Sequence, residues 1–139
     1  MLKRPKYCQT GSMAIKLPVE IIKQITNISL EFKVNKVEVV NRMLETIVQD
    51  ERCFTSSYNR LCYLRTKGII CPRYKDEVDK IGIRIEIKIL EKLCALDGIL
   101  DKEVGGTTFL VEIFRTVYKH EDWWQDIIEQ TEDLMIGEC

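Results

Sequence analysis

The sequence predicts a mostly helical protein organised around a two-stranded antiparallel β-ribbon, and three patterns lead to that prediction. Two short stretches, residues 12–18 and 80–86, alternate apolar and polar residues with a period of two, which is typical of half-buried strands. Each stretch runs into two successive helical patterns. The second set of strand and helices repeats the first at a nearly constant offset. We therefore expect two strand-helix-helix repeats that form a pseudo-dimer within one chain.

In both predicted strands, one face is apolar and the other carries small residues and a cation. The apolar faces hold Met13, Ile15 and Leu17 in the first strand and Ile81, Ile83 and Ile85 in the second. The opposite faces hold Ser12, Ala14 and Lys16 in the first strand and Lys80, Gly82 and Arg84 in the second. A lone strand cannot satisfy its backbone or bury its apolar face. We expect the two strands to pair antiparallel, with the helices behind them.

Two helical patterns complete the first repeat, which spans residues 12–49. Pro18 stands where the first helix begins, because its fixed φ suits a helix start and its missing N–H costs nothing there. Apolar residues then recur with helical period from Ile21 to Phe32. Asn35 is the expected N-cap of the second helix, which continues to about Gln49.

The second repeat, residues 80–120, follows a connector of residues 50–79. The connector returns the chain so that the second strand lies beside the first, and Ser56 or Ser57 is expected to cap a short helix within it. Counterpart residues of the two repeats differ by 68 in number through the strand and the first helix, and by 70 through the second helix. The change of two comes from a longer turn, L-D-K-E-V-G-G-T-T, between the helices of the second repeat.

Residues 121–139 predict an acidic C-terminal helix that contains Trp123 and Trp124. All 21 Lys and Arg lie in residues 1–120 with 15 of the 22 Asp and Glu, which gives that part a charge of +6, and the seven remaining acids give the helix −7. A basic body of this kind is compatible with a nucleic-acid partner. Because acids and no cations follow the tryptophans, we expect them to pack against the body or a partner rather than to stack on bases.

Composition and motifs narrow the class of protein. The 139 residues are expected to form a single domain. No apolar run approaches about 20 residues, and no apolar region follows the basic N-terminus, so we expect a cytoplasmic protein with no membrane partner. The six cysteines form no C-x-x-C pair and His120 is the single histidine, so we expect no metal and no cofactor. Without a Gly-rich phosphate loop or a pairing for His120, we expect no enzyme and no catalytic residues.

The segments M-A-I-K-L-P-V-E-I-I and I-G-I-R-I-E-I-K-I-L, each leading into two helical patterns, resemble the ribbon-helix-helix DNA-binding family of the Arc and Met repressor type. The resemblance covers about residues 12–49 and 80–120. Family members normally build the ribbon by dimerisation, whereas both halves stand here on one chain, as in the few single-chain members. The resemblance implies a ribbon that enters the major groove of double-stranded DNA.

The resemblance also implies two sets of DNA contacts. Outward side chains of the ribbon reach base edges, and these are Ser12, Ala14, Lys16, Lys80, Gly82 and Arg84. Arg84 is the best candidate for a bidentate contact to guanine, which is worth about 1–3 kcal/mol of discrimination. The backbone amides that open each second helix grip phosphates, as free N–H groups at a helix start favour anions. The matching positions are Asn35, Lys36, Gly105, Gly106 and Thr107.

We therefore expect sequence-specific binding to double-stranded DNA, as a transcriptional repressor or as an accessory factor of a plasmid, virus or other mobile element. Self-association on adjacent DNA sites is left open. The alternative is a protein-interaction module, antitoxin-like or accessory, that acts through the acidic C-terminal helix. Under that alternative, steep salt-dependent DNA binding is absent. A structural homodimer is the third reading, and it requires the outward face of the ribbon to be covered.

Overall fold

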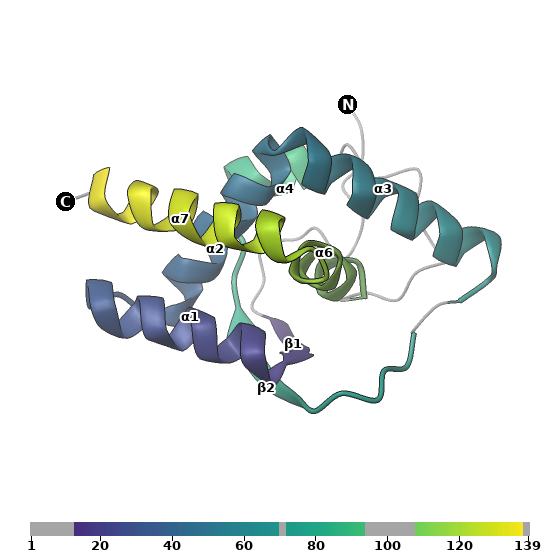
Figure 1. Cartoon of the computed structure of the whole chain (residues 1–139), viewed down its shortest axis with the longest axis horizontal. Coiled ribbons are helices and arrows are strands. Elements are labelled where there is room, and N and C mark those ends of the chain that lie inside the picture. The colour runs from purple at the N-terminus through teal and green to yellow at the C-terminus, as the bar shows by residue number, and fades with distance from the viewer. Residues whose placement is uncertain (1–12, 70–71, 94–107, 138–139) are drawn as a thin grey trace.

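The computed structural model describes residues 13–69, 72–93 and 108–137, which form a two-stranded sheet and six helices (Figure 1). The strands are β1 (Met13–Pro18) and β2 (Val78–Ile83). The helices are α1 (Val19–Phe32), α2 (Lys36–Gln49), α3 (Glu51–Thr66), α4 (Ile87–Leu93), α6 (Thr108–Tyr118) and α7 (Glu121–Gly137). The predicted fold class, mostly helical with a two-stranded antiparallel ribbon, is confirmed at this level.

The two strands form the ribbon, with Ala14 opposite Gly82 and Lys16 opposite Lys80. Ile15 and Ile81 face each other in the same ladder and are buried, which confirms the alternation expected from a period of two. The bounds of the second strand differ from the expected 80–86. The ladder runs from the Pro18–Val78 pair to the Met13–Ile83 pair, so β2 begins and ends earlier than the hydrophobic alternation.

The first repeat follows its predicted order of strand, helix and helix. Pro18 is the last residue of β1 and directly precedes α1, whose buried stripe is formed by Ile21, Ile25 and Ile28. The prediction of Asn35 as N-cap of α2 is confirmed, because its side-chain oxygen accepts a hydrogen bond of 2.8 Å from the amide of Glu38. These two helices pack against each other and cover the buried face of the ribbon.

The connector contains a longer helix than expected. A short helix capped by Ser56 or Ser57 was the wrong expectation, since α3 begins at Glu51 and runs for 16 residues. The cause is Asp50, whose carboxylate accepts hydrogen bonds from the backbone amides of Arg52 and Cys53 and so caps the helix six or seven residues earlier. Ser57 lies instead on the buried face of α3, which packs against α6 and α2.

The second repeat contributes α4 and α6. Among the described residues, α2 contacts β2 and α6 contacts β1, so each of these helices packs against the strand of the other repeat. Gly105, Gly106 and Thr107, expected in the turn before α6, lie outside the described residues, as does Ser12 before β1.

The acidic helix α7 packs across α2 and α6, where Figure 1 shows it as the yellow element. Trp124 is buried and meets the ring of Tyr118 edge-on, with 5.3 Å between the ring centroids. Trp123 is half-buried and stacks on His120 at 3.9 Å. Packing against the body, expected from the acids around the tryptophans, is confirmed for Trp124, which has no exposed face for a base.

Candidate nucleic-acid interface

The outward face of the ribbon is an exposed surface. The side chains of Ala14, Lys16 and Lys80 are exposed, and so are Gly82 within β2 and Arg84 just after it. A Cβ atom added to Gly82 would meet no atom within 4 Å, so the fold itself leaves open space over the centre of the ribbon. The helix α7 packs on α2 and α6, on other parts of the molecule. The residues at the centre of this face are small, and cations lie on either side of that centre.

Two lysines lie directly opposite each other on this face. Lys16 pairs with Lys80 across the ladder, and both are exposed. Like charges at directly opposed positions destabilise a strand pair. An anion placed between the two ammonium groups would remove that repulsion. The arrangement therefore favours a negatively charged partner at this end of the ribbon.

The backbone around Arg84 is held by a side chain from the first repeat. Asn41, on α2, donates from Nδ2 to the carbonyl oxygen of Arg84 at 2.8 Å, and its Oδ1 accepts from the amide of Glu86 at 2.8 Å. Both groups follow the last residue of β2, where the ladder no longer pairs them. Asn41 therefore extends the ordered backbone beyond β2 and positions Arg84 on the outward face.

Arg42, beside Asn41, is a buried cation with a ring of carboxylates. Its guanidinium forms ion pairs with Glu45 at 2.6 Å, with Glu38 at 3.4 Å and with Glu86. Burial by itself lowers the pKa of Arg42, but the hydrogen bond and the charge of Glu86 outweigh it, so the pKa lies above its ordinary value. Arg42 thus offsets the negative charge beside Arg84 and links α2 to the residues before α4.

A groove of about 370 Å³ flanks the ribbon at Arg84. Its other wall is the start of α2, including Asn35 and Glu38. The predicted phosphate contact Asn35 lines this groove, and both Asn35 and the neighbouring Lys36 are exposed. The side chain of Asn35 already accepts a hydrogen bond from the amide of Glu38. The amides that precede Glu38 in the first turn of α2 remain as donors to a phosphate.

A second groove of about 310 Å³ flanks the ribbon at Ala14 and Lys16. Its far wall is the start of α6, with Thr108 and Val111. The predicted contacts Gly105, Gly106 and Thr107 precede this wall and lie outside the described residues. The structure therefore brings the start of one helix to each side of the ribbon, α2 beside Arg84 and α6 beside Lys16.

The residues that support this surface are not among those predicted from the sequence. Asn41 and Arg42 stand at buried positions of α2, and Glu112 stands at a buried position of α6. Most residues three and four positions away from Arg42 and Glu112 are polar, so the helical pattern predicts that both side chains face solvent. The one available signal was the phase of Asn41, because Val37 and Leu44 lie on the same side of the helix, four residues before it and three residues after it.

Other candidate sites are weak in the described part of the chain. Cys53 is a buried free thiol, and burial together with the charge of Asp50 raises its pKa to about 12, so it is protonated at neutral pH. Residues 13–69, 72–93 and 108–137 contain no group of three His, Cys, Asp or Glu side chains that could hold a metal ion. None of the helices described there has the length and apolar character needed to cross a membrane.

The comparisons with known proteins add no relative: neither a protein-family model, nor a curated protein, nor a solved structure matches this chain.

Proposed function

We propose that this chain is a single-chain ribbon-helix-helix pseudo-dimer that binds double-stranded DNA with its ribbon in the major groove. In this proposal the outward side chains of the ribbon read base edges, and the starts of α2 and α6 contact the phosphates on either side. The biological role is that of a transcriptional repressor or an accessory DNA-binding factor of a mobile element.

The register of the ribbon carries the proposal. Counterpart residues in the strands of the two repeats differ by 68 in number. When two equivalent strands pair about a twofold axis, only the residue at the axis lies opposite its own counterpart. Ala14 lies opposite Gly82, which is its counterpart at that offset. The internal repeat and the observed pairing therefore agree on one centre, with the cations placed on both sides of it.

The grooves beside the ribbon support the same pseudo-symmetry. Lys16 and its counterpart Arg84 each line one groove. In the groove at Arg84 the far wall includes Glu38 and Asn41, and in the groove at Lys16 it includes their counterparts at an offset of 70, Thr108 and Val111. The counterparts differ in chemistry, so contacts to the two halves of a DNA site would differ as well. A DNA site without palindromic symmetry follows from this difference.

The chemistry of the face suits the major groove, which admits a two-stranded ribbon. Arg84 carries the planar guanidinium that matches guanine O6 and N7, and Lys16 offers one ammonium to the same acceptors. Ala14 and Gly82 at the centre allow close approach because both are small and exposed. The attraction of a polyanion for Lys16 and Lys80 would offset the repulsion between these two opposed lysines.

The proposal is tested by the affinity for random duplex DNA at two salt concentrations. Wild type is compared with the double variant Lys16→Ala, Arg84→Ala, which we expect to weaken binding at least tenfold, or about 1.4 kcal/mol. The matched control is Arg65→Ala, Lys67→Ala, which removes one Arg and one Lys at the end of α3. We expect this control to bind within about twofold of wild type. An equal loss of DNA affinity in both double variants would contradict the assignment of the ribbon as the DNA-binding face.

The alternative function, a protein partner bound by the acidic helix, is favoured by one observation. The pKa of Glu132 on α7 is raised, first by burial and then by the charges of Glu31, Asp133 and Glu129. Acidic side chains of α7 and α1 therefore crowd one surface, near which Ile136 stands exposed. If wild type shows no DNA binding even at low salt, this surface becomes the place to look for a partner.

A further inference from the structure

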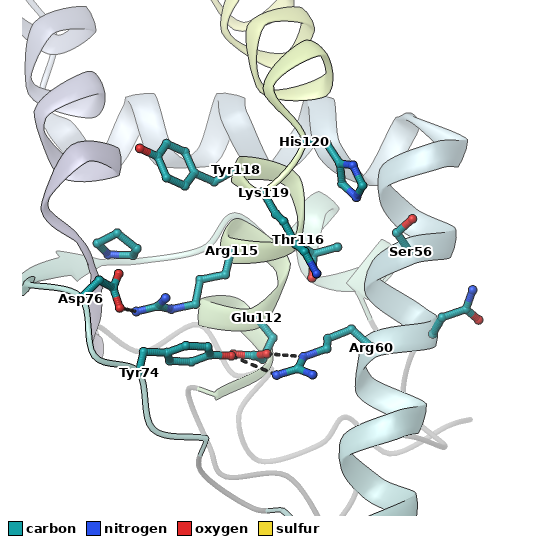
Figure 2. A pocket seen from close by; sticks show the side chains of 12 residues that line it. Ser56, Arg60, Tyr74, Asp76, Glu112, Arg115, Thr116, Tyr118, Lys119 and His120 are labelled. Atoms are coloured by element: carbon teal, nitrogen blue, oxygen red, sulfur yellow. Dashed lines mark hydrogen bonds and ion pairs between the residues drawn. The ribbon is translucent and has the colours of Figure 1, made fainter.

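A cleft of about 540 Å³ lies between α3, α6 and residues 72–77, which lead into β2 (Figure 2). Its volume lies within the range of about 300–1,000 Å³ that is usual for small-molecule sites. Of the predicted base and phosphate contacts that the structure describes, none lines it. The cleft therefore requires an explanation separate from the DNA-binding face.

A buried carboxylate forms the floor of the cleft, and a neighbouring cation offsets its charge. Glu112 is 1% exposed, and its carboxylate accepts hydrogen bonds from Nε of Arg60 at 2.8 Å and from the hydroxyl of Tyr74. Nη2 of Arg60 also donates to the hydroxyl of Tyr74 at 3.2 Å. Figure 2 shows these three side chains converging from α6, α3 and the segment before β2. This network holds the three elements together and presents Arg60 to the cleft.

A second cation closes the side of the cleft nearest the ribbon. The guanidinium of Arg115 lies 3.5 Å from the ring centroid of Tyr74 and forms an ion pair with Asp76 at 3.0 Å. Its Nε is buried and donates no hydrogen bond within the described part of the chain. Arg115 thus keeps an unused donor beside the cleft.

The open side of the cleft carries donors and a further cation. Figure 2 shows Ser56, Thr116, Lys119 and His120 around this opening. Among the described residues, no carboxylate forms an ion pair with Lys119. Among the described residues that line the cleft, three permanent cations face two carboxylates, and the two carboxylates already have cationic partners. The surplus of positive charge and of hydrogen-bond donors is the chemistry of an anion site.

We propose that this cleft binds a small organic phosphate, with the phosphate group near Lys119 and the hydroxyls of Ser56 and Thr116. A single phosphate ion would leave most of the cleft empty, so the ligand is expected to be an ester with a polar organic part. Tyr118 and Pro18 supply a less polar wall on the side toward α1 for that part.

Occupancy of the cleft is expected to change the ribbon, a step that rests on the proposed DNA-binding function. Tyr74, Glu112 and Arg115 line the cleft and also line the groove beside Ala14 and Lys16, so they form a wall common to both. The cleft also reaches Pro18, the last residue of β1. A bound anion would compete with Glu112 and Asp76 for their cations and so move this common wall.

Calorimetric titration with ribose 5-phosphate tests the site directly. We expect saturable binding, at least tenfold weaker binding of inorganic phosphate, and at least a tenfold loss in Lys119→Ala. The control Lys67→Ala, an exposed lysine on another part of the surface, should bind as wild type does. No saturable binding up to about 10 mM ribose 5-phosphate, or unchanged binding in Lys119→Ala, would overturn the site. Equal affinity for inorganic phosphate would overturn the ester and identify free phosphate as the ligand.

The link to DNA is tested by measuring DNA affinity with and without saturating ribose 5-phosphate at constant ionic strength. We expect a change of at least threefold that disappears in Lys119→Ala, because direct competition at the ribbon would persist in that variant. An unchanged affinity, or a change that persists in Lys119→Ala, would overturn the link. If no DNA binds under any condition, the DNA-binding proposal fails, and calorimetry alone still decides the cleft.

Discussion

The side chain of Asn41 in α2 donates a hydrogen bond of 2.8 Å to the carbonyl oxygen of Arg84, just past the end of β2. The same side chain accepts from the amide of Glu86, so one residue of the first repeat satisfies two backbone groups of the second. Through this contact, the position of the best candidate for base recognition depends on a helix that stands 43 residues earlier in the chain.

The variant Asn41→Ala is expected to lower the free energy of unfolding by about 1–3 kcal/mol, because two backbone groups that its amide satisfies lose their partner. Urea unfolding measures the change. The matched control is Asn27→Ala, an exposed asparagine on α1, which should stay within about 0.5 kcal/mol of wild type. Equal effects of the two variants would contradict the role assigned to Asn41.

A substitution at the opposed lysines is expected to change stability and DNA affinity in opposite directions. Lys80→Glu places opposite charges across the ladder from Lys16, and we expect a gain of about 0.2–1 kcal/mol in stability that shrinks at high salt. DNA affinity should fall in the same variant. In a Lys16→Ala background the stability gain should vanish, and a gain that persists would show that the two lysines do not interact.

Gly82 separates the demands of folding from those of binding. A valine at this exposed position has open space around its Cβ and favours a strand, so the stability of Gly82→Val should equal or exceed that of wild type. Its branched side chain should block close approach at the centre of the ribbon and weaken DNA binding at least tenfold. Wild-type DNA affinity in a folded Gly82→Val protein would exclude the ribbon centre from the interface.

Asp50 makes the stability depend on pH in a defined direction. The hydrogen bond from Arg52 lowers the pKa of Asp50, burial opposes this, and the amide of Cys53 adds to the lowering. A carboxyl with a folded-state pKa below its unfolded value of about 3.9 stabilises the protein above that pH, and loses the contribution as pH falls through the folded value.

The variant Asp50→Asn keeps a capping oxygen and removes the charge. We expect wild type to be more stable by about 0.2–1 kcal/mol at neutral pH, since Arg52 is partly exposed. The difference should shrink as pH falls below about 3.9, and urea unfolding of both proteins from neutral pH down to about pH 2 measures it. A difference that stayed constant down to that pH would assign the effect to packing instead of charge.

The strands and helices were predicted from local sequence patterns. The period of two at residues 13–17 and 81–85, the helical stripe of α1 and the cap at Asn35 depend on neighbours within a few positions, so they can be read in a linear sequence. The ends of the helices and strands were harder to predict from the sequence. Hydrophobic alternation continues to Ile85 although the ladder ends at Ile83, and Asp50 starts α3 before the apolar pattern becomes clear.

The candidate DNA contacts could be predicted in part from the same local patterns. Exposure of Ala14, Lys16, Lys80, Gly82 and Arg84 follows from the alternation alone. The identity of their neighbours does not, because the register between strands 68 residues apart is set by pairing and by the helices beneath. The opposition of Lys16 to Lys80 became visible only with that register.

By itself, the sequence determined the type and order of most helices and strands of this protein. It also determined which side chains of the ribbon face outward, because side-chain periodicity is a local property. The tertiary structure alone decided which distant charges meet. Arg42 and Glu112 occupy counterpart positions at an offset of 70, yet one is a buried cation among carboxylates and the other a buried carboxylate held by Arg60 and Tyr74. Burial makes an unpaired charge costly, so the partners that each charge finds across the fold determine whether it can stay there.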